Sequence, residues 1–154
     1  MWRTGSTIRA EGIDTYEFLF DDRLQDLTFL YSVFTHMFSG DAARYLSEFS
    51  PVMRPGGCVL ASTFIMDRGL ISYLQSNGGE GRRALTFPHE VEEGVFHNDA
   101  NLVSGPTAYS LDRIGAMVRS ASLVPERFVR GRWRKDGEFD VNVHDLVILR
   151  KPAF

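Results

Sequence analysis

A strand, a helix and a second strand between residues 27 and 64 constrain the fold more than any other part of the sequence. Residues 27–34 (LTFLYSVF) are apolar, aromatic or β-branched on both faces, which is typical of a central parallel strand that helices cover on each side. Asp41 is the expected N-cap of a helix over residues 42–53, in which the apolar residues fall at helical spacing. Residues 54–57 (RPGG) end that helix and lead into a second buried strand over 58–64. This βαβ pattern predicts an α/β fold with a parallel sheet.

The rest of the sequence predicts one domain spanning all 154 residues. Residues 76–107 hold five Gly and two Pro and are interpreted as an irregular insertion inside that domain. Ser110 is the expected cap of a helix that ends near Ser120. Two strands, over 127–133 and 141–149, then follow as a terminal antiparallel hairpin joined by a polar turn.

Composition and charge exclude several classes of partner. A net charge of -3 gives no general attraction to nucleic-acid backbones or to anionic lipid, so neither is expected as a partner. No stretch reaches the roughly 18 apolar residues that a membrane span needs. The single cysteine, Cys58, cannot form an internal disulfide and is expected to be a small buried apolar residue in a reducing, cytoplasmic setting. Arg130, Arg132 and Arg134 alternate along a strand and predict a solvated face more than an anion site.

An ordered series of short segments resembles the carboxyl-terminal half of class I S-adenosylmethionine-dependent methyltransferases. These segments are YSVFTHM (31–37), YLSE (45–48), VMRPGG (52–57), STF (62–64), GRW (131–133) and HDLVILRK (144–151). The resemblance covers roughly Asp14 to Lys151. It implies a partial Rossmann-like sheet of parallel strands that ends in an antiparallel hairpin.

The amino-terminal features of that family are absent from the sequence. The family begins with a strand and a glycine-rich "GxGxG" turn, and an acidic residue at the end of the next strand binds the ribose hydroxyls. Neither feature precedes residue 27. We therefore expect a truncated methyltransferase-like domain with an incomplete S-adenosylmethionine site.

The resemblance also implies site residues. Ser32 and Val33 follow the first strand, where relatives contact the methionine part of the cofactor, and Asp14 aligns with an aspartate that accepts from the adenine amino group. Ser32 could equally be a buried hydroxyl bonded to nearby backbone, and Asp14 could be a surface residue. His36 is the candidate catalytic base, because its ordinary pKa near 6.5 allows proton transfer at neutral pH; the alternative is a helix-start residue bonded to Asp41.

Other chemistry-bearing residues have weaker patterns. Residues 89–99 hold two His and several acids, but without zinc-type spacing, so no metal is expected. Phe87, Phe96 and Tyr109 are candidates either for an acceptor pocket or for a satellite core. His144 and Asp145 are neighbours in a strand and point to opposite faces, which excludes a relay between them.

Two function classes follow from these expectations. The first is a methyltransferase, or the carboxyl-terminal half of one, acting on a small-molecule acceptor. The alternative is a catalytically inactive binding or assembly module, or a fragment without independent function. If the amino-terminal strands are missing, the strand over 27–34 has an unpaired apolar edge, so we expect a homodimer or a partner chain to cover it.

Overall fold

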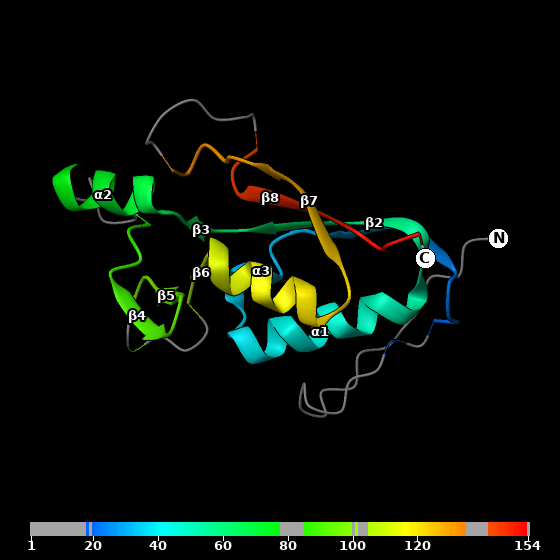
Figure 1. The fold of residues 1–154 in the computed structure, drawn as a ribbon. Helices are drawn as coiled ribbons and strands as arrows, with labels where there is room; N and C mark the ends of the chain where they lie inside the picture. Colours follow the sequence, from blue (N-terminus) through cyan, green and yellow to red (C-terminus); the bar gives the residue numbers. More distant parts are fainter. Residues whose placement is uncertain are drawn as a thin grey trace.

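The computed structural model describes residues 18, 20–77, 85–99, 101, 105–134 and 142–153 (Figure 1). Its strands are β1 (Gln25–Leu30), β2 (Met53–Thr63), β3 (Ile65–Met66), β4 (His89–Glu92), β5 (Val95–His97), β6 (Thr107–Ser110), β7 (Val124–Val129) and β8 (Asp145–Arg150). Its helices are α1 (Ser39–Val52), α2 (Arg68–Asn77) and α3 (Leu111–Ser120), with a short 3-10 turn, η2 (Phe34–His36), before α1. None of the helices in these ranges is long and apolar enough to cross a bilayer.

The strands form two sheets. The larger has the order β1-β2-β8-β7, in which β1 and β2 are parallel and β8 runs antiparallel to both β2 and β7. The smaller has the order β3-β6-β5-β4, with β3 parallel to β6. The expected α/β fold, with parallel strands and a terminal antiparallel pair, is therefore confirmed.

Helices α1 and α3 lie on the same side of the larger sheet (Figure 1). Val59 and Ala61 of β2 point toward them and are fully buried, because alternate residues of a strand face the same side. The main core also includes Leu46, Phe49, Ile114, Met117, Val118, Val147 and Leu149. The helical spacing of apolar residues in α1 and α3 thus fixes which side of the sheet is buried.

Strand β1 departs from its sequence prediction. It is an edge strand among the described residues, not a central one. Leu30 packs against the main core, but Leu27, Phe29 and Tyr31 on the other face are 63%, 56% and 51% exposed. Cys58, which pairs with Leu27 and so shares that face, is only half-buried. The expectation of two buried faces was wrong because no described strand or helix covers this side of β1.

The start of α1 differs from its sequence prediction, whereas the two glycines that follow the helix occupy positions that favour glycine. The helix begins at Ser39 after Phe38, which makes no side-chain cap bond, and Asp41 lies in the first turn instead of at the N-cap. Gly56 has a φ of +78°, which favours glycine. Gly57 is required for a different reason: a Cβ there would lie 2.9 Å from the carbonyl oxygen of Arg54.

The carboxyl-terminal elements agree more closely with the sequence. Ser110 caps α3, and its hydroxyl accepts from the backbone N–H of Arg113 at 3.1 Å, as predicted. Leu111, however, is exposed and does not belong to the buried face of α3. Within the segment interpreted as irregular, β4 and β5 pair as a hairpin and extend the smaller sheet.

Candidate functional site

The carboxyl ends of the parallel strands β1 and β2 meet at one edge of the larger sheet, where ligands bind in open α/β sheets. Ser32, just beyond β1, has a φ of +58°. Its backbone N–H donates to the Ser62 hydroxyl of β2 at 2.7 Å, and its own hydroxyl lies 3.2 Å from that of Thr35. A left-handed conformation costs a residue other than glycine about 1 to 3 kcal/mol. Ser62 therefore holds a strained turn in place at the end of β1.

His144, the residue before β8, lies at the same edge of the sheet. Its Nδ1 lies 3.4 Å from the Ser62 hydroxyl, and its ring stacks on Tyr31 at 5.2 Å between centroids. Burial lowers the pKa of His144 below its ordinary value of 6.5, and the nearby His36 charge lowers it further. Neutral imidazole is thus the favoured form of His144 at neutral pH.

Sequence reasoning placed three of its four site residues on the connection that follows β1. Ser32 and Val33 lie directly after the strand, and His36 ends η2 with an exposed side chain. Val33 is half-buried and packs against the main core. Asp14 lies outside the described residues. His144 was missed as a member of this site, because no short-range pattern links it to residues more than 100 positions earlier.

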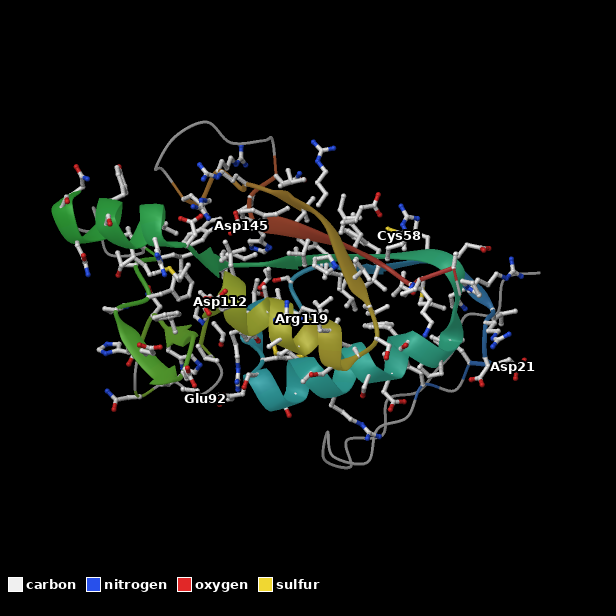
Figure 2. The ribbon with its side chains drawn as sticks, viewed as in Figure 1. Asp21, Cys58, Glu92, Asp112, Arg119 and Asp145 are labelled. Atoms are coloured by element: carbon white, nitrogen blue, oxygen red, sulfur yellow. The ribbon has the colours of Figure 1, made fainter. Side chains whose placement is uncertain are left out.

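A buried ionic cluster supports the same end of the sheet. Asp145, labelled in Figure 2, accepts from the backbone N–H groups of Ile65 and Gly131, each at 2.8 Å. Burial raises the pKa of Asp145 to about 6, although these hydrogen bonds and the Arg134 charge oppose the rise. Arg134 pairs with Asp67 at 2.5 Å and donates to the carbonyl of Ile65 at 3.0 Å.

This cluster overturns the expected solvated arginine face. Arg134 is 1% exposed, whereas Arg130 and Arg132 are exposed, and all three follow the end of β7 at Val129. The alternation expected of a strand therefore does not apply to them. The buried guanidinium contacts Asp145 of β8 at 3.9 Å, the Ile65 carbonyl of β3, and Asp67, which lies between β3 and α2.

A hollow with a volume of about 630 Å³ lies between α2 and the β4–β5 hairpin. It is lined by Met66, Ile71, Leu74, Gln75, Thr86, Phe87, Pro88, Glu90 and Phe96. Phe87 and Phe96 line this hollow and also belong to a satellite core: Phe87 is buried in a second apolar cluster with Phe64, Met66, Leu70 and Ala108, and Phe96 packs against that cluster. Tyr109 belongs to the main core instead, where its hydroxyl donates to the carbonyl of Met37 at 2.5 Å and lies 3.2 Å from that of Phe34. Burial raises the pKa of Tyr109 well above its usual range, so its hydroxyl acts as a donor.

The histidines and acids of the insertion do not form a cluster. His97 is buried and its Nε2 lies 3.2 Å from the Thr107 hydroxyl, while His89 is exposed at the start of β4. Within the described ranges, no group of three or more His, Cys, Asp or Glu side chains is arranged to hold a metal ion.

Comparisons with known proteins agree with this topology. No family model matches the sequence. A Methanosarcina mazei S-adenosylmethionine-dependent methyltransferase aligns with a TM-score of 0.59 and 18% identity, over 94% of this chain and 66% of that one. The Burkholderia thailandensis 1,6-didemethyltoxoflavin-N1-methyltransferase, solved with S-adenosylhomocysteine, aligns at 0.54 and 16%, over 94% and 50%. Human N-acetylserotonin methyltransferase, solved with S-adenosylmethionine, aligns at 0.51 and 18%, over 82% and 29%.

These likenesses establish the fold. The chain has a methyltransferase-like α/β architecture over nearly all of its length. It spans less than two thirds of the length of each of these three solved proteins.

Proposed function

We propose that this chain is an S-adenosylmethionine-dependent methyltransferase, or the carboxyl-terminal half of one, with its cofactor site at the ends of β1 and β2. The observation that carries the proposal is Ser32, a non-glycine residue held in a left-handed conformation by Ser62 at the end of β1 in a methyltransferase-like sheet. Strained residues of this kind concentrate at functional sites. Solved neighbours that hold S-adenosylmethionine or its demethylated product support the choice of cofactor.

The described residues fit one end of that cofactor. The backbone of Ser32 and Val33, with the nearby hydroxyls of Thr35 and Ser62, suits the polar methionine part. The resemblance places the ribose-binding carboxylate on a strand beyond β1, and no described strand lies on that side. We therefore propose that this chain supplies half of the binding contacts.

The cofactor supplies an activated methyl group, and this chain's residues orient the acceptor and manage its proton. Orientation and proximity can carry most of the rate of such a displacement. His36, exposed beside the strand ends, is the proposed base for the acceptor's proton. His144, held neutral chiefly by burial, borders the same space through its contact with Tyr31.

We further propose that another polypeptide segment covers the free edge of β1 and completes the site. An exposed strand edge presents unpaired N–H and C=O groups that favour pairing with another strand. Beside this edge lies a groove lined by apolar side chains of β1, α1 and the segment before β1, including Phe18, Phe20, Tyr45 and Phe49. The solved neighbours are longer than this chain, which supports as the occupant of this edge a segment that carries a strand of the same kind of fold.

Titration of the isolated chain with S-adenosylmethionine, followed by backbone amide NMR, tests the cofactor site. We expect the amides of Ser32 and Val33 to shift at millimolar concentration, corresponding to about 4 kcal/mol of binding free energy. Adenosine, which lacks the methionine part, is the matched control and should leave those two amides unmoved. Absence of shifts at Ser32 and Val33 would contradict the proposed site, and micromolar affinity would contradict its incompleteness.

Light scattering tests the free edge. We expect the purified chain to self-associate, and Phe29→Lys, which places a charge on the exposed face of β1, to reduce that association. A compact monomer over a wide concentration range would contradict an uncovered edge. A stable dimer that gives no cofactor shifts would favour the alternative, a catalytically inactive assembly module, which is supported by the lack of a described strand on the outer side of β1.

A further inference from the structure

We propose that the hollow between α2 and the β4–β5 hairpin binds a flat, largely apolar small molecule that is neutral or positively charged. On the premise of the proposed function, that molecule is the methyl acceptor. The volume of about 630 Å³ falls within the range of roughly 300 to 1,000 Å³ that is usual for small-molecule sites. Apolar side chains form most of its wall: Met66, Ile71, Leu74, Phe87, Pro88 and Phe96.

The wall of this hollow is held in place before any ligand binds. Phe87 is 1% exposed and has a φ of +48°, a true outlier for a bulky residue. The side-chain oxygen of Asn98 accepts from the backbone N–H groups of Thr86 and Phe87, at 2.9 and 3.2 Å. Asn98 thus fixes the strained turn that directs the Phe87 ring, as expected of a preorganised site.

The polar groups of the hollow select for charge. One carboxylate oxygen of Glu90 accepts from the N–H of Gly94 at 2.8 Å, and the other has no partner among the described residues. Glu93 adds a second exposed carboxylate to the same hairpin. Glu90 is exposed, so water solvates its second oxygen in the free protein; a ligand with an N–H or O–H donor would replace that water, whereas the two carboxylates would weaken the binding of an anionic ligand.

A continuous row of ring contacts joins the hollow to the strand ends. Tyr31 stacks on His144 at 5.2 Å, His144 contacts Phe64 at 4.9 Å, and Phe64 contacts Phe87 at 5.2 Å, all between ring centroids. The ring of Phe87 therefore belongs both to the wall of the hollow and to the aromatic side of the proposed methyl-transfer site. The rings of Phe64 and His144 stand between a ligand in the hollow and the strand ends, so they must move aside for that ligand to reach the proposed methyl-transfer site.

Fluorescence titration with two matched probes, in the absence of S-adenosylmethionine, tests the proposal. N-phenyl-1-naphthylamine is flat, neutral and carries one N–H donor; 8-anilinonaphthalene-1-sulfonate has the same ring system with an added anion. We expect saturable one-to-one binding of the neutral probe and at least tenfold weaker binding of the sulfonate. Equal or tighter binding of the sulfonate would overturn the assigned ligand charge.

Three variants locate the bound probe. Leu74→Trp fills the hollow from a partly exposed position on α2 and should weaken the neutral probe at least tenfold. Glu90→Gln, at an exposed position that should not disturb folding, should weaken it severalfold. Phe29→Lys, on the exposed face of β1, is the control and should leave the affinity unchanged.

The outcomes separate this inference from the proposed function. Probe binding that Leu74→Trp leaves unchanged, or that Phe29→Lys abolishes, would place the probe elsewhere and overturn the inference. Circular dichroism compares the folding of Leu74→Trp and Phe29→Lys with that of the wild type. Glu90→Gln gives an independent answer if Leu74→Trp does not fold. Cofactor shifts at Ser32 without probe binding would refute this inference alone, whereas probe binding without those shifts would refute the acceptor role and leave the pocket standing.

Discussion

Replacement of Gly131 by Ala adds only one methyl group, but we expect it to lower the stability of the fold substantially. The backbone of Gly131 approaches the chain entering β8 so closely that an added Cβ would lie 2.3 Å from the carbonyl carbon of His144. The same Cβ would lie 2.6 Å from the carbonyl oxygen of Val143. Both obstacles are backbone atoms, which cannot rotate away as a side chain can. The φ of Gly131 is not in the left-handed region, so the expected penalty is a steric one.

The size of the penalty follows from what must move. Overpacking of a close contact costs about 1 to 3 kcal/mol. Separation of the two segments would also strain the hydrogen bonds from the N–H of Gly131 to Asp145 at 2.8 Å and from the N–H of Trp133 to Val143 at 3.2 Å. Each such bond contributes about 1 kcal/mol. We therefore expect Gly131→Ala to lower the free energy of unfolding by about 3 kcal/mol.

Urea denaturation followed by circular dichroism measures this loss. With a slope of about 1 to 3 kcal/mol per molar urea, the midpoint should fall by about 1 to 3 M. Gly115→Ala, inside α3, is the matched control, because its added Cβ meets only the flexible end of Arg119, at 3.2 Å. A helix-interior Gly→Ala change stabilises by about 1 kcal/mol, so the two variants should shift the midpoint in opposite directions.

Two results would refute this reasoning. An unchanged midpoint in Gly131→Ala would mean that the two segments separate without cost. Equal destabilisation by Gly115→Ala would mean that the added methyl group, and not the close backbone approach, causes the loss. Because the displaced backbone carries His144, the imidazole resonances of His144 should also move in Gly131→Ala but not in Gly115→Ala.

Two further predictions concern the buried ionisable groups. The imidazole of His144 should titrate by NMR with a midpoint below 6.5. His36→Gln should raise that midpoint only in part, because burial is the larger cause of the lowered pKa. A midpoint above 6.5 would contradict the described packing. Because the pKa of Asp145 is raised in the folded chain to about 6 from 3.8, its contribution to stability is fully present below pH 3.8 and is lost as the pH rises through 6. The difference in unfolding free energy between the wild type and Asp145→Asn should therefore shrink between pH 4 and pH 7, and a difference that grows over that range would contradict the raised pKa.

The parts of the fold that the sequence predicted are those set by local periodicity. The run of apolar residues in β1, the helical spacing in α1 and the cap of α3 at Ser110 all act within a few residues of one another. The hairpin of β4 and β5 was not predicted, because strands of four and three residues are too short to show a period. The exposure of β1 was not predicted either, since the same apolar run suits a strand with two covered faces.

The residues of the candidate site also differ in how far they could be predicted from local sequence. Ser32, Val33 and His36 could be grouped from sequence because one connection carries them all. His144 could not, because its approach to Ser62 depends on the antiparallel register that pairs Ser62 with Leu146. The burial of Arg134 likewise depends on Asp67, which precedes it by 67 positions.

The proposed cofactor site begins just beyond β1, the strand whose outer edge the proposed partner covers, so the two proposals link association to cofactor binding. Any segment that pairs with β1 also sets the surroundings of Ser32, one residue beyond the exposed Tyr31. If that segment supplies the ribose contacts, it raises the affinity for S-adenosylmethionine. By thermodynamic linkage the cofactor must then raise the affinity for the segment by the same factor. On the premise of the proposed function, the apolar residues Leu27, Phe29 and Tyr31 and the strained turn at Ser32 are two parts of one surface, and a partner that covers only the apolar part would leave the turn without the cofactor.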